Sequence, residues 1–336
     1  MVTTSQVLRQ SRFAPCFRDA VDLVAEPVRN PGPGEIRVRN HWCGVNGIFD
    51  TQIARNAVSY MPVSLPTYTG VEAIGVVEAV GESVTGFKVG DAAVTVRFTW
   101  GYRETATAPA AHFIRVPATN PDYLALSSTG VSALLALQHT GALRPGEVVA
   151  ISAAAGGLGH LMVQIAKQRG AHVVAVCGGA QKMDFVRGLG ADRVIDYKAE
   201  DVAAVLAAEY PGALDVAIDT VSGPIFDAFV DHIARHGRLV VAGAAQDLDG
   251  RPEIVTGPRI AHRIYYKGAS IRGFMNGLLT DLWPQARETL FSLLDEGKIR
   301  VTFDAVRFQG LHQVPDAVEH LLSGRSMGKV VVDLRP

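Results

Sequence analysis

Short apolar runs, rich in β-branched residues, recur through the middle of the chain between about residues 145 and 275. Helix-length segments separate most of them, and strands that alternate with helices indicate βαβ units and a parallel sheet. Nearly every position in these runs is apolar, as expected for strands that are buried on both faces. The six runs are VVAIS (148–152), HVVAV (172–176), RVID (193–196), DVAID (215–219), RLVVAG (238–243) and SIRGF (270–274).

The N-terminal part, up to about residue 120, has a different pattern. It is rich in Val, Gly and Pro, and its short apolar runs are separated by turn residues, which is typical of β-strands. The clearest predicted strands are EIRVRNHWCGV (35–45), GVEAIGVVEAVG (70–81) and DAAVTV (91–96).

The last section, from about residue 276, mixes helices with a strand. Its pattern predicts an amphipathic helix over 282–297, a second helix around 315–323 and a closing strand over 328–334. No linker or low-complexity segment sets this section apart. We therefore expect an α/β protein of two domains, or three, because 336 residues exceed one small domain.

Composition and charge narrow the class of protein. Hydrophobic residues make up 48% of the chain and charged residues 19%, and the formal net charge is −1 with no basic or acidic block. This composition is typical of a soluble globular protein, and it argues against nucleic acid or an anionic membrane as partner. We see no signal peptide, no membrane-spanning run and no disulfide framework among three scattered cysteines. We therefore expect a cytoplasmic protein.

The strongest local signal lies in VVAISAAAGGLGHLMVQIAKQRGA, residues 148–171. An apolar strand enters a turn of small residues, a helix with one apolar face follows, and the next strand begins at His172. This is the setting of the dinucleotide fingerprint G-x-G-x-x-G, with Ala154 in place of the first Gly. Small residues let the backbone approach the pyrophosphate, which then lies at the helix N-terminus. A tight turn without a ligand is the alternative. The candidate cofactor residues here are Ala155, Gly156, Gly157, Leu158 and Gly159.

The end of the second strand distinguishes NADP from NAD. An NAD site usually carries an acidic residue there, which binds the ribose 2′-hydroxyl. This chain has Cys177, Gly178 and Gly179 instead, and Lys182 follows as a candidate cation for a 2′-phosphate. We therefore predict NADP(H), although Lys182 could also be an ordinary solvated lysine.

Seven segments spread along the chain form a specific set, although each alone says little: GVN (44–46), GVEAIGVVEAVGESVTGFKVGDAAV (70–94), SAAAGGLGHLMVQIAKQRGA (152–171), LGADRVIDYK (189–198), GALDVAIDTVSG (212–223), HGRLVVAG (236–243) and GKVVV (328–332). Together they resemble motifs of the medium-chain dehydrogenase/reductases, in particular the zinc-free quinone oxidoreductase and prostaglandin or enoyl reductase branch. The resemblance implies a GroES-like partial β-barrel over residues 1–122, an NADP-binding Rossmann domain over 123–275 and a C-terminal return to the first domain over 276–336.

The resemblance also implies further cofactor contacts. Tyr197 corresponds to a residue that packs on the NADP 2′-phosphate, and Ser132 and Ser326 fall where the family often has small polar contacts. Residues at strand ends would form the wall beside the nicotinamide, and packing alone is the alternative for each of them. These strand-end residues are Ala242, Gly243, Phe274, Met275 and Asn276, and Val221 is a further candidate cofactor residue.

A catalytic zinc needs about three protein ligands. Relatives that use zinc supply a Cys near the position of Asn46 and a His where Val71 stands in Gly70-Val71-Glu72. The chain also has too few cysteines for the family's structural zinc site of four. We therefore predict no metal. Because no strong Lewis acid would then polarise a carbonyl group, hydride transfer to a conjugated C=C is the favoured reaction.

The leading hypothesis is an NADPH-dependent enone or enoyl reductase. An NADPH:quinone oxidoreductase differs only in the acceptor, and a non-catalytic NADPH-binding protein, structural or sensory, is the third hypothesis. Tyr60 and Asn46 are the candidate catalytic residues: Tyr60 as a proton donor, with water as the alternative, and Asn46 as a polar group near the nicotinamide. The aromatic residues that could line the substrate site are Tyr68, Trp100 and Tyr102.

The last strand of the predicted sheet, SIRGF (270–274), should lie at its edge. A long apolar edge favours pairing with another strand. Pairing across a two-fold axis gives a dimer, and the resemblance also implies a homodimer.

Overall fold

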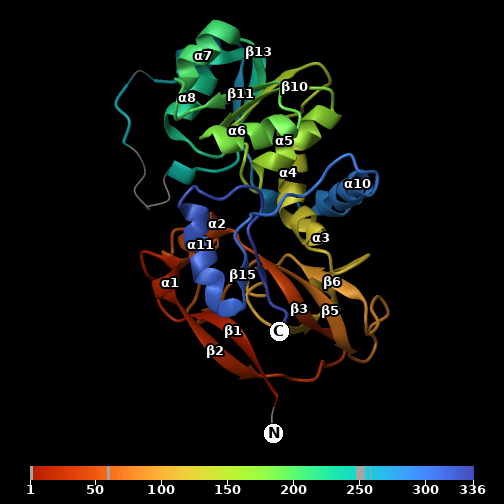
Figure 1. Cartoon of the computed structure of the whole chain (residues 1–336). Helices are drawn as coiled ribbons and strands as arrows, with labels where there is room; N and C mark the ends of the chain where they lie inside the picture. The colour runs from red at the N-terminus through yellow and green to blue at the C-terminus, as the bar shows by residue number, and fades with distance from the viewer. Residues whose placement is uncertain (1–2, 59–60, 247–253, 258) are drawn as a thin grey trace. The chain divides into compact units, whose positions relative to one another are not determined.

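The structure is a computed structural model of the chain, and it describes residues 3–58, 61–246, 254–257 and 259–336. The chain forms two compact units (Figure 1): the residues up to Ser128 together with Phe303–Pro336, and Thr129–Thr302. The first unit therefore contains segments from both the N-terminal and the C-terminal part of the chain. The second unit extends to Thr302, and within it α10 (Trp283–Asp295) contacts α4 (Val131–Leu135). The domain bounds at 122 and 275 stay a prediction.

The second unit contains a six-stranded parallel sheet in the order β11-β10-β9-β12-β13-β14. All six predicted strands are present, although β13 begins five residues earlier than its apolar run. Their bounds are β9 Val148–Ile151, β10 His172–Cys177, β11 Arg193–Asp196, β12 Leu214–Asp219, β13 Ile233–Val241 and β14 Ser270–Gly273. The strand order reverses between β9 and β12, and ligands bind at such a point, beyond the carboxyl ends of the strands.

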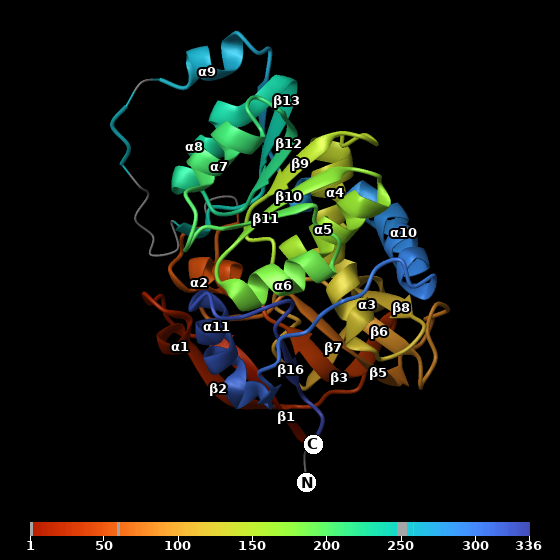
Figure 2. The same ribbon diagram turned by 45° about the horizontal axis from the view of Figure 1, so that its top comes forward.

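Helices cover both faces of this sheet. Figure 2 shows α5 and α6 on one face and α7 and α8 on the other. The sequence explains one helix start directly, because the Asp201 carboxylate accepts hydrogen bonds from the backbone N–H groups of Ala203 and Ala204 at the beginning of α7. The helices that follow α4 are α5 Gly159–Gln168, α6 Ala180–Gly188, α7 Val202–Glu209, α8 Gly223–His232 and α9 Ala261–Tyr265.

Short helical turns join the regular elements of the second unit. Two π-helical turns flank α4, and two 3₁₀ turns precede α10. They are η2 Leu126–Gly130, which begins in the first unit, η3 Ala136–Thr140, η5 Asn276–Leu278 and η6 Thr280–Leu282.

The first unit is built from two sheets. One has the order β15-β16-β3-β5-β6-β8, with β7 paired to β3, and the other has the order β2-β1-β4. The pairing of β3 with β5 shifts register twice, and such bulges bend and twist a sheet. The strands are β1 Thr4–Gln10, β2 Val21–Pro27, β3 Glu35–Gly44, β4 Thr67–Tyr68, β5 Glu72–Val80, β6 Ala92–Thr95, β7 Thr105–Pro109, β8 Phe113–Val116, β15 Phe308–Gln309 and β16 Val331–Asp333.

Helices from both ends of the chain complete the first unit. Val314 and Val318 on one face of α11 share a buried core with Leu8 of β1 and Val332 of β16. This packing closes the unit across the whole length of the sequence. The helices are α1 Phe17–Ala20, α2 Gly47–Ala54, η1 Ala110–His112, α3 Pro121–Ala125, η7 Leu311–Gln313 and α11 Val314–Leu322. No helix in the described part of the chain is long and apolar enough to cross a membrane.

Candidate functional site

The turn between β9 and α5 has the close packing that a dinucleotide loop needs. A Cβ atom added to Gly159 would lie 2.4 Å from the carbonyl oxygen of Ala153 and 2.7 Å from the Cα of Ala154. Both are backbone atoms, so only glycine fits there without moving the chain. Ala153 itself has a positive φ of 47°, which an L-residue adopts rarely.

Ala154 replaces the first glycine of the fingerprint without disturbing this turn. Its side chain is completely buried, and its N–H donates to the carbonyl oxygen of Val176 at 3.0 Å. No side chain caps the start of α5 in the described structure, and its first turn carries no acidic residue. The first N–H groups of a helix attract anions, so the loop is suited to a phosphate.

The end of β10 brings together residues that were predicted separately. A Cβ added to Gly178 would lie 2.7 Å from the ring of Tyr197, so the aromatic ring covers this glycine closely. Tyr197 keeps 52% of its surface exposed. Gly179 has a φ of 96°, and its N–H donates to the Asp196 carboxylate at 2.8 Å. Burial raises the pKa of Cys177 to about 11, so its thiol is neutral.

Lys182 lies in the first turn of α6, directly after the glycine turn at the end of β10. The structure therefore brings Gly178, Gly179 and Tyr197 to one corner of the sheet, with Lys182 in the first turn of the helix that follows. Asp196, which the sequence analysis missed, braces this corner. An acidic residue at the end of an apolar strand was the feature of the sequence from which Asp196 could have been predicted.

Asp219 organises the adjacent corner at the end of β12, and the sequence analysis missed it as well. The carboxylate is fully buried, accepts from the Ser152 hydroxyl at 2.8 Å, and accepts from the N–H groups of Val221 at 3.0 Å and Ser222 at 2.9 Å. The Ser152 hydroxyl in turn accepts from the N–H of Thr220 at 2.8 Å. This network ties the end of β12 to the end of β9, beside the dinucleotide loop.

The predicted nicotinamide-side residues lie where the parallel strands end. The N–H of Ala242 donates to the carbonyl oxygen of Asp219 at 2.7 Å, and that of Phe274 donates to Val241 at 2.9 Å. Asn276 is engaged locally, because its Oδ1 accepts from the indole N–H of Trp283 at 2.8 Å. Of the other predicted nicotinamide-side residues, Gly243 lies beside Thr220 and Met275 directly before η5. Ser132, predicted as a small polar contact to the cofactor, lies in α4.

Asn46 belongs to a buried polar network of the first unit. Its Nδ2 donates to Glu72 Oε1 at 3.1 Å, and its Oδ1 accepts from Lys329 Nζ at 3.1 Å. Lys329 Nζ also lies 2.6 Å from Glu72 Oε1 and donates to the carbonyl oxygen of Val45 at 3.0 Å. Glu72 and Lys329 are both buried. The network fixes which way the Asn46 amide faces. Ser326, also in this unit, is nearly buried.

Asp50 and Tyr102 form a second buried pair beside Asn46. The Tyr102 hydroxyl donates to Asp50 Oδ2 at 2.6 Å, and the backbone N–H of Asn46 donates to the same oxygen at 3.2 Å. Burial raises the pKa of Asp50 to about 7 despite these two donors. Tyr102 is completely buried. Tyr102 is predicted to line a substrate site, but it is a core residue of the first unit.

The other two predicted substrate-lining aromatics pack on one arginine. The Arg103 guanidinium lies 4.6 Å from the centre of the Tyr68 ring and 4.5 Å from that of Trp100. The Tyr68 hydroxyl donates to Glu26. This stack accounts for both aromatics within the first unit, and their contact with a substrate stays a prediction. Tyr60 lies outside the described residues.

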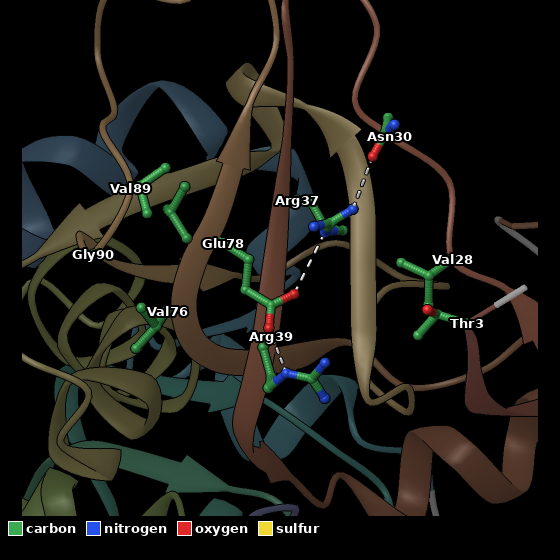
Figure 3. A pocket seen from close by; sticks show the side chains of 10 residues that line it. Thr3, Val28, Asn30, Arg37, Arg39, Val76, Glu78, Val89 and Gly90 are labelled. Carbon is green, nitrogen blue, oxygen red and sulfur yellow. Dashed lines mark hydrogen bonds and ion pairs between the residues drawn. The ribbon is translucent and has the colours of Figure 1, made fainter. Parts of the chain in front are cut away.

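One surface pocket of the first unit, of about 730 Å³, is separate from all of these residues. Figure 3 shows Arg37 and Arg39 both directed at Glu78, with Arg37 also reaching Asn30. The two guanidinium groups thus share one carboxylate, and we assign this pocket no chemistry. Within the described ranges, no group of three or more His, Cys, Asp or Glu side chains could hold a metal ion.

Comparison with known proteins identifies the family. The model of the alcohol dehydrogenase GroES-like domain matches residues 32–118, and that of the zinc-binding dehydrogenases matches residues 157–292. The chain is 36% identical to prostaglandin reductase-3 of Bos taurus, over 98% of this chain and 90% of the relative. It is 32% identical to a probable quinone oxidoreductase of Leishmania amazonensis, over 95% of each chain.

A solved structure of this family has the same fold as the chain. The Escherichia coli quinone oxidoreductase complexed with NADPH superposes with a TM-score of 0.81 at 26% identity, covering 98% of this chain and all of that one. The two domain types are those of one class of oxidoreductase. The chain belongs to the medium-chain dehydrogenase/reductase family, in its zinc-free quinone oxidoreductase and prostaglandin reductase branch. The predicted family and fold class are confirmed.

Proposed function

We propose that this oxidoreductase transfers a hydride from NADPH to the conjugated C=C of an enone or enoyl substrate, without zinc. The prediction of an NADPH-dependent enzyme is confirmed at the level of the class. The E. coli relative was solved with NADPH, and a Bacillus subtilis relative, 30% identical over 68% of this chain, is named a putative NADP-dependent oxidoreductase. The acceptor and the residues that act on it are our proposal.

The residues at the end of β10 are the main support for NADPH as the cofactor. Gly178 and Gly179 stand where an NAD site would have an acidic residue; the space at Gly179 is open, and the exposed Tyr197 ring lies directly against Gly178. We propose that a 2′-phosphate lies on this surface, with Lys182 as its cation. The pyrophosphate would lie at the uncapped start of α5, close to Gly156 and Gly159.

When bound, NADPH supplies the hydride. The chain must then stabilise the negative charge that develops on the substrate oxygen, for which a preorganised hydrogen-bond donor serves. We propose Asn46 for this role. Its Nδ2 has two hydrogens, of which Glu72 accepts one, so the second can donate to the substrate. The Lys329 ammonium bonded to Oδ1 polarises the amide and strengthens that donor. Tyr60 or a water molecule would then protonate the carbon.

A steady-state assay of NADPH oxidation tests the acceptor class. It compares an enone series, an enoyl thioester and simple quinones, with NADH as the control cofactor. We expect rapid turnover of enone or enoyl acceptors with NADPH and much slower turnover with NADH. Turnover of quinones alone would establish the second hypothesis, which the Leishmania relative favours.

Two variants test the residues. Asn46→Leu should lower kcat with the preferred acceptor and leave the NADPH dissociation constant near its original value. Tyr60→Phe should lower kcat if the phenol delivers the proton. Tyr210→Phe is the matched control, because that hydroxyl bonds only to His172 in the described contacts of the second unit. Unchanged kcat in Asn46→Leu would exclude the proposed donor.

We also propose a homodimer formed by the edge strand β14. In the described residues β14 pairs only with β13, so its other edge can pair with a second copy across a two-fold axis. Light scattering after gel filtration should give twice the chain mass of 35.8 kDa, and Ile271→Pro should give the monomer. A dimer that survives this substitution would contradict the β14 edge as the interface.

The cysteines Cys16, Cys43 and Cys177 are free thiols, which supports our proposal of a reducing, cytoplasmic location.

A further inference from the structure

Three polar side chains at four-residue intervals on α5 bind the backbone of one segment that is neither helix nor strand, residues 298–302. Gln168 donates to the carbonyl oxygen of Lys298 at 3.1 Å. Gln164 makes two bonds with Arg300: its Nε2 donates to the carbonyl oxygen at 3.0 Å, and its Oε1 accepts from the N–H at 2.9 Å. His160 Nε2 accepts from the N–H of Thr302 at 3.2 Å. We call these contacts the α5 ladder.

The register of the ladder follows from elementary geometry. Four residues of helix rise about 6 Å, and two residues of extended chain advance about 6.6 Å. Successive side chains on one helix face can therefore bind alternate residues of an antiparallel extended segment over three steps. Ile299, between the bonded residues Lys298 and Arg300, is buried. The N–H groups of Lys298 and Ile299 donate to the carbonyl oxygen of Leu293 in α10, and the side chains of α5 bind the backbone of Lys298, Arg300 and Thr302.

The first step of the ladder also reaches the dinucleotide loop. His160 Nδ1 lies 3.0 Å from the carbonyl oxygen of Gly156, and the imidazole is completely buried. Because Nε2 accepts the Thr302 N–H, a neutral ring carries its hydrogen on Nδ1 and donates it to Gly156. One side chain therefore binds both the loop expected to hold the pyrophosphate and the last residue of the second unit, after which the chain enters the first unit at Phe303.

We propose that His160 and Gln164 are positioning residues that couple NADPH binding in the loop to the order of residues 298–302. A phosphate that fixes the loop also fixes the Gly156 carbonyl, which holds the His160 ring in place for Thr302. By thermodynamic reciprocity, the ordered segment strengthens NADPH binding by the same factor. The proposal rests on NADPH as the cofactor, and it adds a role for residues that lie behind the cofactor surface.

Hydrogen exchange of two amides measures the coupling directly, because the N–H groups of Arg300 and Thr302 are bonded to Gln164 and His160. We expect saturating NADPH to slow the exchange of both by about 5-fold or more, the range of a typical coupling between sites. His160→Phe should raise the NADPH dissociation constant and remove the effect of NADPH at Thr302. Gln164→Met should act in the same direction and less strongly.

Gln168→Met is the matched control, because this exposed outer step lies farthest from the loop. It should change the NADPH dissociation constant less than Gln164→Met does. A purely structural His160 would make His160→Phe lower the melting temperature equally with and without NADPH, and that result would overturn the proposal. So would normal NADPH binding with unchanged exchange at Arg300 and Thr302. If the original chain binds no NADPH, the cofactor assignment itself fails, and the coupling fails with it.

Discussion

The packing of Gly159 allows a quantitative prediction. In a helix, alanine is usually more stable than glycine by roughly 0.5–1 kcal/mol. Here the added methyl group would lie 2.4 Å from the carbonyl oxygen of Ala153 and 2.7 Å from the Cα of Ala154. Neither backbone atom can rotate away, so the turn must open. Overpacking of this kind costs about 1–3 kcal/mol, which exceeds the gain in helix propensity.

We therefore expect Gly159→Ala to lower the free energy of unfolding by about 1–2 kcal/mol. The NADPH dissociation constant should rise at least about tenfold, since a loss of about 1.4 kcal/mol in binding has that effect. Urea denaturation measures the first quantity, and titration of cofactor fluorescence measures the second.

The control is Gly188→Ala, at the end of α6, where an added Cβ has no heavy atom within 4 Å. It should keep or slightly increase stability and leave NADPH affinity unchanged. If Gly159→Ala matched the original chain in both measurements, the close approach of the loop to the helix would not be a constraint, and the reasoning would be refuted.

Three further predictions follow from the corners and networks described above. Gly178→Ala should displace the Tyr197 ring, which is exposed and can move. NADPH affinity should therefore fall several-fold, while the urea midpoint of unfolding stays constant. An unchanged affinity would argue against a phosphate beside Gly178 and Tyr197. Burial raises the pKa of Asp50 to about 7, above its unfolded value near 4, so the stability that its neutral form contributes is full below about pH 4 and is lost as the pH rises through 7. The amide in Asp50→Asn does not titrate. The free energy of unfolding of this variant, minus that of the original chain, should therefore rise by about 2 kcal/mol between pH 5 and 8. If the two proteins lost or gained stability in parallel over this range, the titration of Asp50 would be excluded. Lys329→Met leaves Glu72 buried without its cation and should cost about 3–5 kcal/mol, whereas the double variant with Glu72→Gln should recover most of that loss in urea denaturation.

Much of the second unit could be predicted from local pattern. Strands that are buried on both faces must be apolar throughout, and helices on a sheet must show an apolar stripe, so VVAIS, HVVAV and the following runs predicted a parallel sheet. The glycine turn was also predictable from local sequence. The backbone approaches so closely at Gly159 that only glycine fits.

The contacts that hold the candidate site together depended on the tertiary structure. Lys329 binds Asn46 from 283 positions away, and Thr302 binds His160 from 142 positions away. Sequence spacing carries no information about such pairs, because loop closure brings them together only when the whole unit folds. Tyr102 shows the same limit: its aromatic ring suits a substrate wall or a core equally, and only the buried Asp50 beside it decides between them. Hydrophobic periodicity thus determined the elements, whereas the partners of buried polar groups were decided by long-range packing, because each such group must find its hydrogen bond wherever the fold supplies one.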